Sequence, residues 1–154
     1  MDLVVVIKQL DRRSMKRILV LCTGNSCRSQ IAEGYLRRFA GNRATIFSAG
    51  IEKHGVNPLA VRTMKEDGID ISNQTSNLVD EYLNLDFDFV ITVCDNANEQ
   101  CPIFPGNTKK FHCDFQDPAK ATGTDEEVLA RFRSVRDAEN TRLAILEMIH
   151  FFFG

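Results

Sequence analysis

The sequence predicts an α/β fold, in which a parallel sheet carries helices on both faces. Short apolar runs alternate along the chain with longer segments whose apolar residues recur at helical spacing. The chain has 154 residues, which suits one domain. Hydrophobic residues make up 44% of the sequence and charged residues 26%, so a core of useful size is available.

Four segments are predicted as strands. Residues 87–93 form a nearly continuous apolar run, which is typical of a strand buried on both faces. Residues 18–21 form a shorter apolar run that ends in a glycine-containing turn. The remaining two segments are residues 44–48 and 110–113.

Two helices are indicated in the first half of the chain. Residues 29–40 place Ile31, Tyr35 and Leu36 on one apolar stripe, and Gly41 ends the pattern. Asn57 followed by Pro58 is a good start for a second helix, which runs to about residue 67.

Two further helices are expected in the second half. Ser76 is expected to cap a short helix that reaches residue 83. Residues 124–127 have the form of a capping box, and the helical pattern continues from there to about residue 152. The length of this last helix favours a break near residues 138–140.

The first fourteen residues are interpreted as an extension outside the core fold, which then comprises residues 15–154 as one domain. Met15 heads a second plausible start, and no basic segment or cleavage site typical of a signal peptide surrounds the early apolar run. No apolar run approaches the ~20 residues of a membrane span. The net charge of −2 argues against nucleic acid and anionic membranes as partners. We expect a cytoplasmic monomer.

The five cysteines are Cys22, Cys27, Cys94, Cys101 and Cys113. An odd number without a signal peptide argues against a secreted disulfide framework, so these thiols are free, metal-bound or catalytic. Cys22 and Cys94 each follow a predicted strand. Because ligands bind beyond the carboxyl ends of parallel strands, two cysteines at the same rim indicate a site.

The segment from Cys22 to Arg28 predicts an oxyanion-binding loop. It joins a strand to a helix, and Gly24 and Asn25 tolerate the positive φ that lets backbone N–H groups turn inward. Such amides at a helix N-terminus bind anions, and the Arg28 guanidinium suits a tetrahedral oxyanion. The same positive field is expected to lower the pKa of Cys22 and make it a nucleophile. The residues of the expected anion site are Thr23, Gly24, Asn25, Ser26, Cys27, Arg28 and Ser29.

Individual residues of this loop allow alternatives. Cys22 could be a small buried apolar residue, although its neighbours favour the nucleophile. Cys27 is interpreted as a packing residue. Ser29 could donate a hydrogen bond to the Cys22 thiolate or simply cap the following helix.

Cys94 and Cys101 flank a polar stretch that could be a short helix. Seven helical residues span about 10 Å along the axis, whereas a disulfide needs Cα atoms within about 7 Å. A bond between these cysteines would therefore require the helix to unwind, which should cost little in so short and polar a segment. Packing, or a zinc site shared with His112 and Cys113, is the alternative, although the spacing is wide for zinc.

The loop and several later motifs resemble the thioredoxin-coupled arsenate reductases, which share the low-molecular-weight protein tyrosine phosphatase fold. The resemblance covers most of the chain and implies a sheet with strand order 2-1-3-4. The phosphatase branch usually has proline where this chain has Gln30, and an aromatic residue where it has Ala119. Both departures favour the reductase branch. The matching segments are residues 22–30, 48–52, 54–58, 70–73, 75–76 and 117–119.

The resemblance implies a chemical sequence for arsenic detoxification. Cys22 attacks arsenate, Cys94 then attacks Cys22 to release arsenite, and Cys101 attacks Cys94 to leave an exposed disulfide that thioredoxin reduces. Phosphate or sulfate would occupy the same loop. Asp117 matches the general acid of the family, with Asp114 as the nearby competitor. No tightly bound cofactor is expected, and Cys113 is interpreted as an incidental buried thiol.

The resemblance also raises a potassium site beside the loop. Asn25, Glu33, Ser48 and Thr75 match ligand positions, but Asn77 stands where some relatives have an aspartate. Losing a carboxylate weakens a site for a hard cation.

Two other functions stay open: a tyrosine phosphatase that uses Cys22, Arg28 and Asp117 with weak or full phosphatase activity, and a redox or oxyanion sensor without enzymatic activity.

Overall fold

The computed structural model describes residues 2–4 and 15–146. Its centre is a parallel four-stranded sheet in the order β2-β1-β3-β4, which confirms the predicted fold class and strand order. β1 lies in the interior of the sheet, where its neighbours bury Ile18–Leu21 completely. The strands are β1 (Lys16–Cys22), β2 (Ala44–Gly50), β3 (Phe89–Thr92) and β4 (Lys109–His112).

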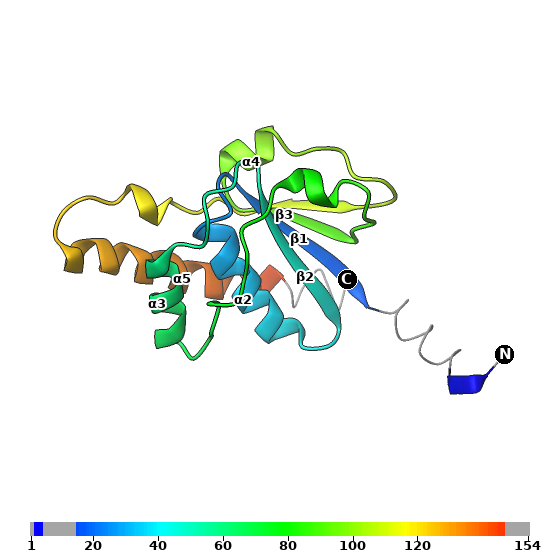
Figure 1. Cartoon of the computed structure of the whole chain (residues 1–154), viewed down its shortest axis with the longest axis horizontal. Coiled ribbons are helices and arrows are strands. Elements are labelled where there is room, and N and C mark those ends of the chain that lie inside the picture. The colour runs from blue at the N-terminus through cyan, green and yellow to red at the C-terminus, as the bar shows by residue number, and fades with distance from the viewer. Residues whose placement is uncertain (1, 5–14, 147–154) are drawn as a thin grey trace.

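Helices cover the sheet in two layers (Figure 1). α2, α3 and α5 lie together on one side, while the shorter α4 and η1 lie on the other. This arrangement buries the central strands β1 and β3, whereas the edge strand β4 stays largely exposed. The helical elements are α2 (Arg28–Ala40), α3 (Pro58–Glu66), η1 (Val79–Tyr82), α4 (Asp95–Glu99), η2 (Pro118–Lys120) and α5 (Asp125–Leu146).

The core follows from the apolar patterns of these elements. One cluster joins β1 and β3 to the inner faces of α2 and α5, and a second lies between α2, α3 and α5 around Tyr35 and Phe132. Aromatic side chains extend the first cluster under η1, where Phe47, Tyr82 and Phe87 meet edge to face. The result is a rigid support whose strands all end at one rim.

Two predicted helix starts are confirmed by their capping contacts. The Asn57 side chain accepts a hydrogen bond from the N–H of Leu59 at 2.9 Å, one residue inside the Pro58 start of α3. The Thr124 hydroxyl accepts one from the N–H of Glu127 at 3.2 Å. Both caps satisfy backbone donors that the first helical turn leaves unpaired.

The prediction that Ser76 caps a short helix is wrong. The turn that forms is η1, and the carboxylate of Glu81 caps it by accepting the N–H of Leu78 at 2.7 Å. The Ser76 hydroxyl donates instead to the carbonyl of Gly24 at 3.3 Å. A tertiary contact with the Cys22–Arg28 loop thus competes successfully with local capping.

The expected break near residues 138–140 is also absent, because α5 continues from Asp125 to Leu146. The stretch contains neither glycine nor proline, and Val135, Glu139 and Leu143 keep one stripe of the helix buried across it. The predicted end near residue 152 lies outside the described residues.

Most of the proposed N-terminal extension also lies outside the described residues, so its separation from the core stays a prediction. Leu3 and Val4, which are described, are exposed. No helix in the described part of the chain combines the length and apolar character needed to cross a membrane.

Candidate active site

The loop between β1 and α2 turns its carbonyl groups outward. The carbonyls of Cys22, Thr23, Gly24 and Ser26 accept N–H groups from Ile51, Glu52, His54 and Asn57, at 2.7 to 3.2 Å. With the carbonyls directed at this neighbouring segment, the interior of the loop is left to N–H groups, and those of Asn25 and Ser29 bond to the Cys22 sulfur. The loop thus has the curled form with inward N–H groups that the sequence predicts, and its role in binding an anion stays a prediction.

Asn25 holds the loop in this curled form. Its φ of 46° lies in the left-handed region, which asparagine tolerates better than most residues. Its side-chain oxygen accepts the N–H of Asn77 at 2.8 Å, and its amide nitrogen donates to Ser29 at 2.7 Å and to Ser48 at 3.0 Å. Since Asn25 is fully buried, these bonds also satisfy its polar atoms.

Gly50 permits the close approach of this loop to β2. A Cβ atom at Gly50 would lie 2.7 Å from both the nitrogen of Asn25 and the carbonyl oxygen of Thr23. Contacts this short are repulsive, so any side chain here would displace the loop.

Cys22 ends β1 at the bottom of the loop with only 2% of its surface exposed. Its sulfur lies 2.9 Å from the hydroxyl of Ser29. Burial raises the pKa of the thiol, against the expectation of a lowered value, while the Ser29 hydrogen bonds, the Arg28 charge and the Asn25 N–H act in the lowering direction. The loss of hydration thus outweighs the positive field from which the expectation was drawn.

Arg28 and Asp117 meet beside the loop, as their proposed shared role requires. The Arg28 guanidinium donates to the carbonyl of Phe115 at 3.1 Å and lies 3.6 Å from the Asp117 carboxylate. Asp117 begins η2 and accepts the N–H of Ala119 at 3.0 Å. Asp114 faces elsewhere, since its carboxylate groups with Asp95 and His112. Asp117 is therefore the better placed of the two candidate acids.

The remaining loop side chains divide between packing and scaffolding. Cys27 is buried with Ile31 and Tyr35 between α2 and α3, and burial raises its pKa to about 12. Gln30 is fully buried and its amide donates to the carbonyls of Asn25 and Thr75 at 3.0 and 2.9 Å. Gln30, the departure from the phosphatase pattern, thus ties α2 to the segment that supports Asn25.

Cys94 reaches the same rim from β3. Its sulfur lies 3.4 Å from the Thr23 hydroxyl, and 3% of the residue is exposed. The sulfur also accepts the N–H of Ala97 at 3.4 Å, so Cys94 is the N-cap of α4. Asn96 adds a second link from α4 to the loop by donating to Thr23 at 3.1 Å.

Cys101 follows the short helix α4 and is partly exposed. α4 comprises the five residues Asp95–Glu99, which agrees with the short helix expected between the two cysteines. All five cysteines are free thiols in this structure. Cys94 and Cys101 are therefore not bonded to each other, and α4 separates them along the chain.

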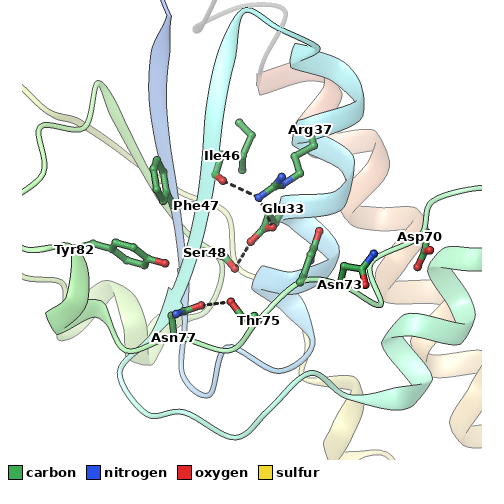
Figure 2. Close-up of a pocket in the computed structure, with 11 residues that line it drawn as sticks. Glu33, Arg37, Ile46, Phe47, Ser48, Asp70, Asn73, Thr75, Asn77 and Tyr82 are labelled. Carbon is green, nitrogen blue, oxygen red and sulfur yellow. Dashed lines mark hydrogen bonds and ion pairs between the residues drawn. The ribbon is translucent and has the colours of Figure 1, made fainter. Parts of the chain in front are cut away.

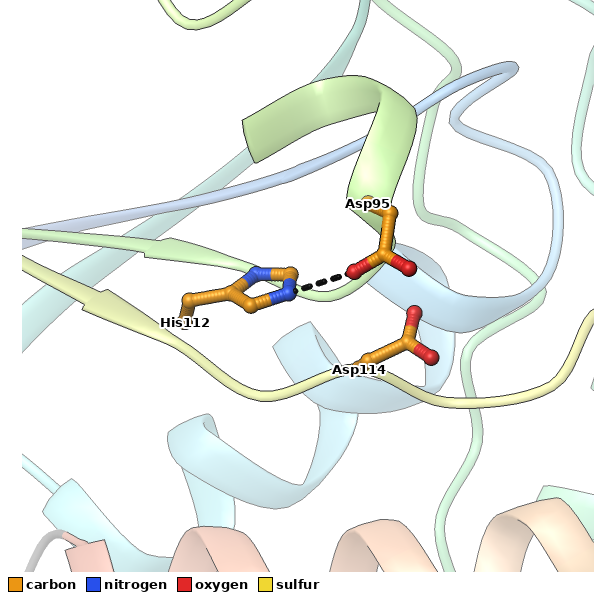
Figure 3. A group of neighbouring side chains, drawn as sticks. All are labelled: Asp95, His112 and Asp114. Atoms are coloured by element: carbon orange, nitrogen blue, oxygen red, sulfur yellow. Dashed lines mark hydrogen bonds and ion pairs between the residues drawn. The ribbon is translucent and has the colours of Figure 1, made fainter. Parts of the chain in front are cut away.

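The zinc alternative finds no support in the described residues. There the one group of potential metal ligands is Asp95, His112 and Asp114, which contains no cysteine (Figure 3). His112 bonds through one ring nitrogen to Asp95 at 2.8 Å and through the other to Thr92 at 2.7 Å. The bond between His112 and Asp95 links β4 to the start of α4.

Of the four proposed potassium ligands, Glu33, Ser48 and Thr75 line a pocket beside the loop (Figure 2). Asn25 does not line this pocket, although its amide donates to Ser48. Ser48 donates to Glu33 at 2.6 Å, and the other carboxylate oxygen of Glu33 pairs with Arg37 at 2.9 Å. Thr75 donates to Asn77 at 2.7 Å. Because Arg37 already supplies a positive charge to Glu33, this arrangement does not require a metal ion. A potassium site therefore stays a prediction, and the chemistry of the loop does not require one.

Two features of the site escaped sequence reasoning. The carbonyl of Phe115 binds Arg28, and backbone acceptors carry no residue-specific signal. Glu139 lies fully buried on α5, where the charge of Arg28 acts on it. Its position on the stripe of Phe132, Val135 and Leu143 was the available signal.

The sheet and the loop at its rim define a class of α/β proteins in which a cysteine lies at the bottom of a loop of inward N–H groups. Residues 17–147 match the family model described as low molecular weight phosphotyrosine protein phosphatase, so the chain belongs to that family.

Within this family the chain is similar to arsenate reductases. It is 54% identical over 128 residues to the arsenate reductase of Halalkalibacterium halodurans, covering 83% of this chain and 92% of the relative. Two solved structures, an arsenate reductase in the phosphate binding state and one in the oxidized state, have TM-scores of 0.65 and 0.73. Each is 32% identical and the alignment covers 86% of this chain and 96% of the other.

Proposed function

We propose that this protein reduces arsenate to arsenite by a relay of Cys22, Cys94 and Cys101, with thioredoxin as the final reductant. The observation that carries the proposal is the position of Cys94, whose sulfur contacts Thr23 of the Cys22 loop at 3.4 Å. A phosphatase needs only one thiol in this loop. The similarity to proteins named arsenate reductase supports the same choice.

The first step is attack by Cys22 on arsenate held in the loop. The inward N–H groups and Arg28 bind the oxyanion, and the contacts from Ser29 favour the thiolate. A sulfur–arsenic bond forms and one arsenic–oxygen bond breaks. Asp117 donates a proton to the leaving hydroxyl, which departs as water.

The second step transfers two electrons to arsenic. The Cys94 thiolate attacks the Cys22 sulfur, and the sulfur–arsenic bond breaks with its electron pair remaining on arsenic. Arsenic(V) becomes arsenic(III) and leaves as arsenite, while Cys22 and Cys94 form a disulfide. The contact of Cys94 with Thr23, the residue that follows Cys22, supports this step.

The third step moves the disulfide to the surface. The Cys101 thiolate attacks the Cys94 sulfur, and Cys22 leaves as a thiolate ready for another turnover. Unwinding of α4 brings Cys101 to Cys94. Because Cys101 is already partly exposed, the resulting disulfide becomes accessible to a protein dithiol such as thioredoxin.

The decisive experiment measures arsenate-dependent NADPH oxidation with thioredoxin and thioredoxin reductase. Wild type should turn over, and Cys94→Ser should lose turnover by at least about a hundredfold, because the electron pair of the second thiol is required. Cys113→Ser is the matched control, since Cys113 is a buried thiol that takes no part in the proposed relay, and it should retain activity. Equal turnover by wild type and Cys94→Ser would disprove the relay.

The phosphatase alternative rests on Cys22, Arg28 and Asp117, which meet at the loop without help from Cys94. Hydrolysis of an aryl phosphate should be weak in wild type and should survive in Cys94→Ser. Strong aryl phosphatase activity without arsenate turnover would favour this alternative. If the reduced protein had neither activity, a sensor would be the better interpretation.

A further inference from the structure

Glu139 is a buried carboxyl group without a hydrogen-bond partner. The residue is 0% exposed, and neither carboxyl oxygen has a partner among the described residues. Val135 and Leu143 are buried one turn away on either side. A polar group in such surroundings is unfavourable for folding, so its placement calls for a physical account.

The neighbours of Glu139 connect it to the oxyanion loop. α5, which carries Glu139, packs against α2, and the positive charge of Arg28 at the start of α2 acts on the Glu139 carboxyl. From the segment after β4, Cys113 also lies within its electrostatic influence, and Arg142 of α5 acts on that thiol in turn. From η2, Asp117 faces Arg28 at 3.6 Å. Two carboxyl groups therefore interact electrostatically with Arg28: the partly exposed Asp117 and the buried Glu139.

We propose that Glu139 is a positioning residue for the oxyanion site, which takes up a proton when a doubly charged anion binds and thereby strengthens the attraction of Arg28 for that anion. The inference rests on the proposed function, since it assumes that the loop binds oxyanions. It assigns no contact between Glu139 and the substrate. Glu139 acts through Arg28.

The direction of the proton transfer follows from electrostatics. Burial raises the pKa of Glu139 well above its usual value, and the Arg28 charge is what opposes this increase. A bound dianion offsets the Arg28 charge, which otherwise lowers the pKa of Glu139. Binding of the dianion therefore favours the protonated form of Glu139. By linkage, protonation of Glu139 must favour the anion to the same extent.

The test compares sulfate binding by wild type and Glu139→Gln between about pH 6 and pH 9. Sulfate keeps its double charge over this range, so its own titration does not contribute. Toward the low end the two affinities should converge, because protonation removes the Glu139 charge that distinguishes wild type from the variant. Toward the high end wild type should bind more weakly than the variant, by about fivefold or more. Calorimetry in two buffers of different ionisation enthalpy should show proton uptake by wild type that the variant lacks.

Two further variants separate this effect from packing and from surface charge. Glu139→Leu replaces the carboxyl by an apolar side chain of similar size. The ratio of its sulfate affinity to that of Glu139→Gln should not change with pH. Glu126→Gln removes an exposed carboxyl from the same helix and should behave like wild type. If the ratio of affinities between wild type and Glu139→Gln were constant over the whole range, the inference would be wrong. If wild type bound neither sulfate nor phosphate, the proposed oxyanion site itself would fail.

Discussion

At the scale of single residues, the reactivity of Cys22 depends on a balance between burial and local contacts. Burial raises the pKa of the thiol, and the Ser29 hydroxyl, at 2.9 Å, is the largest contribution in the opposite direction. Ser29 is in turn oriented by the Asn25 amide at 2.7 Å. Asn25, which shapes the loop, therefore also orients Ser29, which favours the Cys22 thiolate.

We expect Ser29→Ala to make Cys22 less reactive at neutral pH. The lost hydrogen bond favours the thiolate, so its removal raises the pKa of Cys22 and shifts the alkylation profile to higher pH. A hydrogen bond to a charged group contributes about 1.5–3 kcal/mol, which slows alkylation at neutral pH by about tenfold or more. The measurement is the rate of iodoacetamide labelling at Cys22, resolved by peptide mass spectrometry.

Ser26→Ala is the control for this prediction. Its hydroxyl acts on Cys27 rather than on Cys22, so labelling of Cys22 should keep the wild-type pH profile. A Ser29→Ala profile that overlays that of wild type would show that the Ser29 contact does not govern reactivity.

At the scale of elements, α4 is a folded helix whose unwinding should cost little free energy. The helix has five residues, and few of its side chains are apolar. It is held by specific contacts, of which His112 to Asp95 at 2.8 Å and Asn96 to Thr23 at 3.1 Å join it to β4 and to the loop. A short helix without its own apolar stripe depends on such contacts, so the element that separates Cys94 from Cys101 can be released locally.

We expect Glu99→Gly to accelerate formation of the Cys94–Cys101 disulfide. Glu99 is exposed at the end of α4, and glycine lowers helix stability by up to about 1 kcal/mol, which corresponds to about twofold to fivefold in rate if unwinding limits the reaction. The reaction is followed with oxidised glutathione in a Cys22→Ser background, by thiol labelling and gel shift. Glu99→Ala should leave the rate unchanged or lower it, and equal rates for the glycine and alanine variants would contradict the role of unwinding.

At the scale of the whole molecule, the parallel sheet brings distant segments to one rim. Cys22 at the end of β1, Cys94 after β3 and Asp117 before η2 all lie at the loop. α5 contributes Glu139, on which the charge of Arg28 acts. Each strand ends in the same direction, so the rim collects side chains separated by up to a hundred or so positions in the sequence. The family match, residues 17–147, spans all of these elements.

We expect a shortened chain that begins at Met15 to fold and to keep arsenate-dependent activity. The first strand begins at Lys16, and the described residues Leu3 and Val4 are exposed. The measurements are thermal unfolding and NADPH-coupled turnover, compared with the full chain. A shortened protein that failed to fold would show that the first fourteen residues belong to the core.

Local sequence patterns are sufficient to predict the fold class and the loop from Cys22 to Arg28, and the family resemblance adds the strand order. These features depend on local patterns: apolar periodicity, capping residues and the close spacing of Cys22, Asn25 and Arg28. The tertiary structure alone decided which distant groups act on that loop. It replaced the Ser76 cap by a contact with Gly24, and burial reversed the expected direction of the Cys22 pKa shift. It also placed Glu139 within the field of Arg28. Burial and long-range charge arise only when segments pack together, and for that reason local sequence patterns do not contain them.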